Sequence, residues 1–337
     1  MRELTVNIPK RGYKIAVGKG LLSGASEYFN LNRKVFIITD SGVPKEYAER
    51  VLDGCKDGII YTVPMGECSK SIATFEEVLT SMLNFKMTRS DCVVAVGGGV
   101  VGDLSAFAAA SYMRGIDFYN VPTTLLAAVD SSIGGKCGVN LAGIKNAVGA
   151  FFQPKGVLID TDTLKTLTKR QFASGLAESI KMALTSDAEL FSILSNNEVT
   201  DENIEEIIVR SLKIKADVVV QDEKESGLRK ILNFGHTLGH GIEACEGLSG
   251  LYHGECVALG MLPLCADEIR ECVKKTLALH TLPTEWQGDI DKALEFTTHD
   301  KKSDGGILSV ITVNKIGKCN IERMTTDEFK KLIKERF

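Results

Sequence analysis

The chain has 337 residues, which is too long for a typical single hydrophobic core and predicts about two domains of ~150 residues each. An apolar content of 44% and a charged content of 25% are typical of a packed globular protein and exclude extensive disorder. A formal net charge of −4 provides no basic face, so we expect no nucleic-acid partner.

Cysteine usage and hydropathy predict a cytoplasmic protein without a membrane partner. The nine cysteines are scattered without CxxC spacing, as expected for reduced thiols. The N-terminus, MRELTVNIPKRGYKI, lacks the apolar core of a signal peptide. The longest weakly polar run, residues 92–113, is interrupted by three consecutive glycines and Asp103, so we expect no transmembrane span.

The first 70 residues contain several strand patterns. LTVNI, YKIAVG and KVFIITD are predicted strands, and the last is a near-continuous β-branched run that ends in Asp40. In open α/β sheets nucleotides bind at the carboxyl ends of such buried parallel strands, although an ordinary strand and turn is the alternative. IIYTV is a further strand, followed by a polar loop with Glu67 and Lys70 and a helix beginning near Ile72.

The strongest N-terminal signal is CVVAVGGGVVGDLSAFAAA, residues 92–110. A β-branched strand leads into Gly97-Gly98-Gly99, then Val100 and Asp103, and then a helix of small residues. Glycines let a backbone approach a pyrophosphate, and the helix N-terminus presents free N–H groups to the phosphate. The spacing is not the GxGxxG fingerprint, and a glycine-rich turn without a ligand is the alternative.

Residues 111–150 continue the polar edge of this predicted sheet. FYNVPTTLLAAVD indicates a strand, a turn and a helix that ends at Asp130, and Lys136, Lys145 and Asn146 follow in glycine-rich loops. Lysines in such loops suit anionic ligand groups, although solvated lysines are the alternative. PKGVLIDTDTL predicts one last strand, and helical periodicity dominates from Thr168, so we place the domain boundary at 160/161.

The second half is predicted to be helical. Helices are expected over RQFASGLAESIKMAL, 187–196, 201–220, the histidine-rich segment, CVALGMLPLCADEIRECVKK and 285–297. A basic loop at Lys301-Lys302 precedes a predicted two-strand hairpin that turns at residues 314–317.

Residues 227–255, GLRKILNFGHTLGHGIEACEGLSGLYHGE, hold three of the five histidines. His236 and His240 are four residues apart, so on a helix both imidazoles lie on one face, and His253 follows. Two histidines with one carboxylate are a common metal-ligand set, whereas a satisfied polar patch is the alternative. Spacing alone leaves the carboxylate open among Glu178, Asp217, Asp222, Glu223, Glu225 and Glu255.

The ordered motifs GGGVVGD, VPTTLLAAVDSSIGGK, GIKN, GLAESIK, DEKESGLRKILNFGHTLGH, HGE and DKK resemble 3-dehydroquinate synthases over roughly residues 40–317. The resemblance implies an α/β Rossmann-like NAD-binding domain at 1–160 and an all-α metal- and substrate-binding domain at 161–337, with the active site in the cleft between them. It also implies NAD, one divalent metal, zinc or cobalt, and a homodimer in which Arg114 reaches the neighbouring site.

Carried over position by position, the resemblance assigns three groups of residues. The metal ligands would be Glu178, His236 and His253, with His240 beside the substrate. The NAD contacts would be Asp40, Glu67, Lys70, Gly98, Gly99, Val100, Asp103, Thr123, Thr124, Lys136, Lys145, Thr163 and Thr166. The substrate and catalytic contacts would be Arg114, Asp130, Lys136, Asn146, Lys181, Lys215, Arg229, Asn233, His240 and one of Lys301 and Lys302.

The implied reaction converts 3-deoxy-D-arabino-heptulosonate 7-phosphate into 3-dehydroquinate and phosphate, the second step of the shikimate pathway of aromatic amino acid biosynthesis. It combines transient oxidation by NAD, phosphate elimination, reduction and an intramolecular aldol closure. A substrate with a carboxylate and a phosphate suits a site rich in lysine and arginine. Three alternatives are a cyclase of another sugar phosphate, a metal-dependent polyol dehydrogenase and a non-enzymatic binding module.

Overall fold

The computed structural model describes residues 1–247, 250–299 and 306–337. The chain divides into two compact units, Met1–Leu167 and Thr168–Phe337. No helix in the described residues is both long and apolar enough to cross a membrane. All nine cysteines lie in described segments, and all are free thiols, as their spacing predicts.

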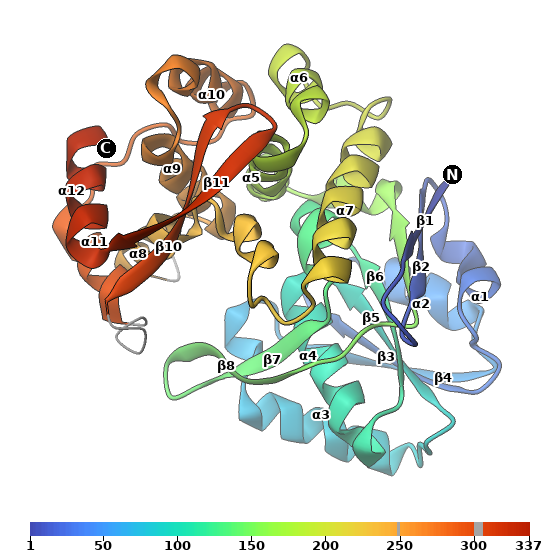
Figure 1. Cartoon of the computed structure of the whole chain (residues 1–337). Coiled ribbons are helices and arrows are strands. Elements are labelled where there is room, and N and C mark those ends of the chain that lie inside the picture. Colours follow the sequence, from blue (N-terminus) through green and yellow to red (C-terminus); the bar gives the residue numbers. More distant parts are fainter. Residues whose placement is uncertain (248–249, 300–305) are drawn as a thin grey trace. The chain divides into compact units, whose positions relative to one another are not determined.

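The first unit is built on a seven-stranded sheet (Figure 1). Its elements are β1 (Arg2–Val6), β2 (Tyr13–Gly18), α1 (Ala25–Tyr28), β3 (Lys34–Asp40), α2 (Lys45–Asp53), β4 (Asp57–Val63), α3 (Ile72–Asn84), β5 (Cys92–Gly97), α4 (Gly99–Ser111), β6 (Asp117–Pro122), β7 (Lys136–Leu141), β8 (Ile144–Phe151) and β9 (Gly156–Asp160). The strand order is β1-β2-β9-β6-β5-β3-β4, and every pair except β1–β2 is parallel. This arrangement confirms the predicted α/β class.

Both faces of the sheet are buried, which explains the near-continuous β-branched runs. Along β3, Phe36 and Ile38 belong to one core cluster, whereas Val35 and Ile37 belong to the other. Residues of α3 and α4 complete the first cluster, and residues of α1 and α2 complete the second. The sheet therefore lies between two helical layers.

Residues 136–151 form an antiparallel hairpin, which corrects the predicted glycine-rich loops around Lys136 and Lys145. The turn residues Ala142 and Gly143 both have positive φ, as a two-residue hairpin turn requires. At Gly149, a Cβ atom would lie 2.1 Å from the Cys137 carbonyl oxygen. The glycines of this stretch therefore permit a close strand pair, where composition alone indicated a flexible loop.

The second unit is mainly helical. Its elements are α5 (Lys169–Ser186), α6 (Ala188–Asn196), α7 (Ile204–Gln221), the 3-10 helix η6 (Leu228–Asn233), α8 (His236–Glu246), α9 (His253–Met261), α10 (Asp267–Leu279), α11 (Ile290–His299), β10 (Ile307–Lys315), β11 (Lys318–Thr325) and α12 (Thr326–Arg336). The predicted hairpin is confirmed as β10–β11. Helix α5 is buried from Ala173 to Thr185, and it packs against α6, α7 and α9.

The histidine-rich segment is not one continuous helix, contrary to the prediction. Arg229 and Asn233 lie on η6, and Gly235, with φ of 76°, separates η6 from α8. A Cβ atom on Gly235 would lie 2.8 Å from the Val257 carbonyl oxygen, so the close approach to α9 also favours glycine there. His236 therefore begins a helix instead of continuing one.

Candidate active site

Three side chains of the second unit converge from three helices. Glu178 comes from α5, His236 from the first turn of α8 and His253 from the first turn of α9. The Nε2 atoms of both histidines lie 3.6 Å from Oε1 of Glu178. Two ligands about 2.1 Å from a tetrahedral ion lie about 3.4 Å apart, so this spacing matches a shared divalent cation.

The carboxylate of Glu178 is buried, and both of its oxygen atoms lack a hydrogen-bond donor among the described residues. Its side chain is 1% exposed. Its contacts are ionic, with the Lys181 ammonium group and the two imidazoles. A buried carboxylate without hydrogen bonds is costly unless a cation compensates it, so these residues fit one divalent metal ion.

Hydrogen bonds on the far side of each imidazole set its tautomer. Nδ1 of His236 lies 3.1 Å from the Phe234 carbonyl oxygen, and Nδ1 of His253 lies 3.1 Å from a carboxylate oxygen of Glu243. Both acceptors require a proton on Nδ1, so Nε2 is the nitrogen that carries the lone pair when the ring is neutral, as in a metal-bound histidine. This is the outer-shell arrangement of metal-binding histidines. Sequence reasoning missed Glu243, although it lies seven residues after His236 on the same helix face.

The other candidate acids have different partners. Glu255 accepts hydrogen bonds from Arg170 at 2.7 and 2.6 Å and from the Tyr252 N–H at 2.6 Å. Asp222 caps the start of η6, where it accepts from the N–H groups of Gly227 and Arg229. Of the alternatives that spacing left open, the structure brings Glu178 to the two Nε2 atoms.

His240 offers a second possible ligand set. Its ring centroid lies 5.3 Å from that of His236 and 5.7 Å from that of His253, and one nitrogen of each imidazole falls within 4.8 Å of the other two. The side chain of His240 is exposed, whereas Glu178 is buried between the other two rings. His240 is thus the accessible histidine of the cluster, as expected for a residue beside the substrate.

The pKa values of Glu178, His236 and His253 are shifted by burial and by the charges around them. Burial raises the pKa of Glu178, but the charges of Lys181 and the two histidines outweigh burial and hold this pKa well below its usual value. Burial, assisted by Lys181, lowers the pKa of His236 to about 3. Burial also lowers the pKa of His253, but Glu178 and Glu243 outweigh it and raise that pKa to about 9. Such opposed shifts within one cluster are typical of functional sites.

Glycines at helix crossings bring the three ligand-bearing helices together. A Cβ atom on Gly254 of α9 would lie 2.0 Å from the Ser174 carbonyl oxygen of α5, and one on Gly260 would lie 2.0 Å from the Gly235 carbonyl oxygen before α8. The N–H of Gly254 also donates to Oγ of Ser174 at 3.1 Å. Close approach at these two points sets Glu178, His236 and His253 within reach of one ion.

Cations predicted to bind the substrate are buried in the same unit. Lys181, Lys215 and Arg229 are 1%, 5% and 3% exposed. Arg229 donates from Nη1 to the Glu223 carbonyl oxygen at 2.6 Å, and Asn233 donates to a carboxylate oxygen of Glu225 at 2.6 Å. Of these three cations, Lys181 forms an ion pair with the buried Glu178 carboxylate. Lys301 and Lys302 lie outside the described residues.

In the first unit, the sheet reverses its strand order between β3 and β5, because β4 and β5 lie on opposite sides of β3. Asp40 ends β3, and Gly97 ends β5 beside it, two residues beyond the paired Ile38 and Ala95. Helix α4 begins at Gly99 with Gly98 as its N-cap. This switch point is where dinucleotides bind in open α/β sheets, and the predicted residues Asp40, Gly98, Gly99 and Val100 surround it.

A polar network connects other predicted residues of the first unit. The buried Lys70 ammonium group contacts Asp103 at 2.7 Å, Glu67 at 3.9 Å and the side-chain oxygen of Asn146. Asn140, which sequence reasoning missed, donates to Glu67 at 2.8 Å and accepts from the Asn146 N–H at 2.8 Å. The network joins α4 to the β7–β8 hairpin. No sequence spacing indicated Asn140, because its partners come from separate elements.

The remaining predicted residues of the first unit are spread more widely. Thr123 and Thr124 follow β6, where the Thr123 N–H donates to the Gly97 carbonyl oxygen at 2.9 Å. Thr163 is buried, and Thr163 and Thr166 both donate their hydroxyls to backbone carbonyls. The side chains of Lys136 and Lys145 are exposed on the hairpin, and Asp130 is half-buried. Arg114 is exposed at the end of α4 away from the glycine turn.

The comparisons with known proteins cover both units. The family model for the N-terminal part of 3-dehydroquinate synthase matches residues 60–174, and the model for the C-terminal part matches residues 175–303. A 3-dehydroquinate synthase of Lactococcus lactis subsp. cremoris (strain MG1363) is 41% identical over 99% of this chain and 100% of its own. One of Streptococcus mutans serotype c is 40% identical over the same shares.

Among solved structures, a 2-deoxy-scyllo-inosose synthase complexed with carbaglucose-6-phosphate, NAD⁺ and Co²⁺ has a TM-score of 0.90 and 26% identity over 100% of both chains. A 2-epi-5-epi-valiolone synthase from Streptomyces hygroscopicus subsp. jinggangensis 5008, with NAD⁺ and Zn²⁺ bound, has a TM-score of 0.86, 26% identity and 96% coverage of both chains. The fold and the cluster thus define a sugar-phosphate cyclase. Within that class, the chain belongs to the 3-dehydroquinate synthase family.

Proposed function

We infer that this protein is a 3-dehydroquinate synthase, an NAD- and metal-dependent lyase of the shikimate pathway. It converts 3-deoxy-D-arabino-heptulosonate 7-phosphate into 3-dehydroquinate and phosphate. The observation that carries this inference is the buried Glu178 carboxylate facing two Nε2 atoms at 3.6 Å, in a chain that matches the family along its whole length.

The proposed metal ligands are Glu178, His236 and His253. When bound, zinc or cobalt supplies a Lewis acid that lowers the pKa of substrate hydroxyls. The Phe234 carbonyl and the Glu243 carboxylate hold the protons of the imidazoles on Nδ1. Lys181 neutralises part of the charge on Glu178, which keeps the carboxylate ionised as a ligand.

The proposed substrate residues bind the anionic groups and orient the sugar. Lys215 and Arg229 are buried cations, and the fork of Arg229 suits the planar carboxylate. His240 is exposed beside the metal ligands, where its imidazole can hold the phosphate or move a proton. Most of the catalysis then comes from positioning and fixed charge. The other proposed contacts are Arg114, Asp130, Lys136, Asn146, Lys181, Asn233 and one of Lys301 and Lys302.

The proposed NAD site is the switch point of the first unit. Asp40 ends β3 with a carboxylate that suits a ribose hydroxyl, and the turn at Gly98 and Gly99 opens α4 toward a pyrophosphate. The polar network around Lys70 and Asp103 supports a second group of contacts. We assign residues 1–160 to NAD and residues 161–337 to metal and substrate.

A homodimer is proposed from the position of Arg114. Its backbone φ is 68° and that of Met113 is 49°, an unusual pair for residues with side chains, and both side chains are exposed. Helix α4 spans 13 residues, so the turn lies about 18 Å from the glycine loop of the same chain. An exposed, strained arginine suits a contact with a neighbouring subunit. We also propose a cytoplasmic location, which the free thiols support.

One incubation tests the function against its rivals. The protein is given the heptulosonate phosphate, catalytic NAD and zinc or cobalt, while phosphate, 3-dehydroquinate and absorbance of NADH are followed together. A 3-dehydroquinate synthase releases both products in equal amounts without net NADH. A polyol dehydrogenase would accumulate NADH, and a cyclase of another sugar phosphate would leave this substrate intact.

A further inference from the structure

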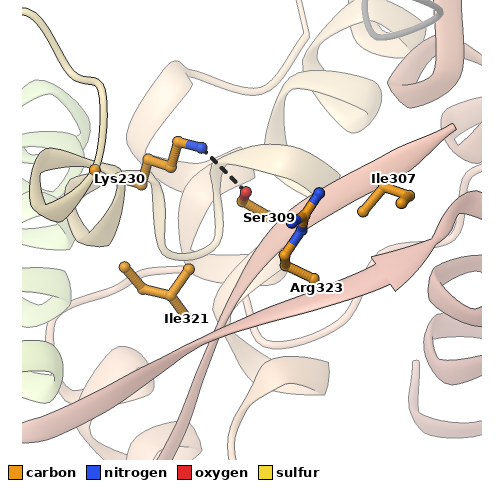
Figure 2. Close-up of a pocket in the computed structure, with 6 residues that line it drawn as sticks. Lys230, Ile307, Ser309, Ile321 and Arg323 are labelled. Atoms are coloured by element: carbon orange, nitrogen blue, oxygen red, sulfur yellow. Dashed lines mark hydrogen bonds between the residues drawn. The ribbon is translucent and has the colours of Figure 1, made fainter. Parts of the chain in front are cut away.

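A pocket in the second unit lies outside the histidine cluster. Gly227 and Lys230, at the start of η6, form one side, and the β10–β11 hairpin forms the other with Ile307, Ser309, Ile321 and Arg323 (Figure 2). The cavity volume is about 440 Å³, which is in the range of small-molecule sites. None of its lining residues is a candidate metal ligand or an expected substrate contact.

Two cationic side chains, Lys230 and Arg323, lie beside Ser309. Lys230 donates from Nζ to Oγ of Ser309 at 3.2 Å (Figure 2). Arg323 is the register partner of Ser309 on the neighbouring strand, so both side chains lie on the same face of the hairpin. The pocket therefore holds an ammonium group and a guanidinium group on either side of one hydroxyl.

These two charges have no acidic partner within residues 1–247, 250–299 and 306–337. The adjacent Glu322 faces the other side of the strand, where it accepts from the Thr312 hydroxyl at 2.6 Å. Like charges gathered without a counter-ion repel each other, so a bound anion would relieve the repulsion. The guanidinium fork favours a planar or tetrahedral oxyanion.

The walls beside the cations are apolar. Ile307 is 40% exposed and Ile321 is 42% exposed, and both side chains line the pocket. Covering them would remove apolar surface from water, which favours a complex. A ligand that satisfies the whole pocket thus combines one oxyanion with a compact aliphatic group.

We propose that this pocket binds a small organic anion, an oxyanion attached to a branched aliphatic group, between η6 and the β10–β11 hairpin. The oxyanion contacts Lys230, Ser309 and Arg323, and the aliphatic group packs against Ile307 and Ile321. The proposal concerns binding alone, so it stands independently of the proposed catalytic function.

Methyl NMR on the full chain tests the proposal at the pocket itself. Isoleucine δ-methyl groups are labelled, and the signals of Ile307 and Ile321 are assigned through Ile→Val variants. The probes are 4-methylpentanoate, its neutral analogue 4-methylpentanamide and inorganic phosphate. We expect 4-methylpentanoate to shift both signals saturably, with affinity at least about tenfold above those of the amide and of phosphate, because each lacks one of the two interactions.

Charge-removal variants provide the matched comparison. The double variant Lys230→Gln/Arg323→Gln should bind 4-methylpentanoate at least about tenfold more weakly, whereas Lys213→Gln/Lys275→Gln, which removes two exposed charges elsewhere, should bind as the wild type does. The melting temperature confirms that each variant is folded. Unshifted Ile307 and Ile321 signals, equal affinity for the amide or phosphate, or unchanged binding in the Lys230/Arg323 variant would each overturn the proposal.

Discussion

Nδ1 of His253 lies 3.1 Å from the Glu243 carboxylate, and Nε2 of the same ring lies 3.6 Å from the Glu178 carboxylate. One acid thus fixes the tautomer of the imidazole, and the other shares the proposed ion with it. The two acids come from α8 and α5, so the ring of His253 joins three helices of the second unit.

Removing the charge of Glu243, the acid that contacts Nδ1 of His253, should weaken metal binding without unfolding the protein. In Glu243→Gln the acceptor of the His253 proton loses its charge, so we expect metal affinity to fall about 10- to 100-fold. Competition with a fluorescent chelator measures the dissociation constant. Glu271→Gln, an exposed acid on α10, serves as the control and should retain wild-type affinity. Equal affinities for the two variants would show that Glu243 does not support the ligand.

The crossing of α5 and α9 should not tolerate a methyl group at Gly254. In Gly254→Ala the new Cβ atom would lie 2.0 Å from the Ser174 carbonyl oxygen, so the helices must separate. We expect a loss of about 1 to 3 kcal/mol in the free energy of unfolding, together with weaker metal binding. Urea unfolding and chelator competition measure the two effects. At Gly24 a Cβ atom meets nothing closer than 3.7 Å, so Gly24→Ala should change neither value much.

The Glu178–Lys181 ion pair should contribute more to the free energy of unfolding in the metal-free protein than in the metal-loaded protein. In Lys181→Met the buried carboxylate loses its cation, which should destabilise the metal-free protein by about 3 to 5 kcal/mol. Saturating zinc supplies another cation to Glu178, so the loss should shrink in the loaded protein. Urea unfolding with EDTA or zinc compares the two states. Lys165→Met breaks an exposed pair with Asp162 and should cost less than about 1 kcal/mol in both. Equal losses for Lys181→Met in both states would contradict the shared-cation account.

Buried His280 should contribute to acid sensitivity. Burial lowers its pKa below the ordinary value of 6.5, although its Nε2 lies 2.7 Å from the Leu194 carbonyl oxygen. The unfolded chain then binds the proton more readily, so this contribution to stability is complete above about pH 6.5 and declines as the pH falls toward the folded pKa. Between pH 7 and pH 5, the free energy of unfolding should fall less in His280→Gln than in the wild type. Parallel pH profiles would refute this role.

Local patterns predicted much of the fold and part of the site. β-branched runs identified the strands that end at Asp40 and Gly97, and the four-residue spacing correctly placed His236 and His240 on one helix face. The carboxylate of Glu178 could not be chosen from spacing, because it lies 58 positions before His236 and meets it only through helix packing. Family resemblance supplied that assignment, and the geometry supports it.

The errors have physical reasons. Residues 136–151 were expected to be loops, because glycine permits both flexible chains and the close strand approach seen at Gly149. Arg229 and Asn233 were expected on the helix of His236, but the left-handed Gly235 breaks that helix where α8 meets α9. Asn140 and Glu243 were missed because each is defined by its partner across space.

The assignment of His253 as a metal ligand, and of His240 as a residue beside the substrate, is tested most directly by metal analysis of two variants. His253→Ala and His240→Ala are purified under identical conditions, dialysed against zinc and analysed for bound metal and turnover. The account predicts that His253→Ala loses the metal and the activity, whereas His240→Ala retains about one metal ion per chain and loses turnover. Full metal content in His253→Ala, or loss of metal from His240→Ala, would contradict the assignment of Glu178, His236 and His253 as the ligands.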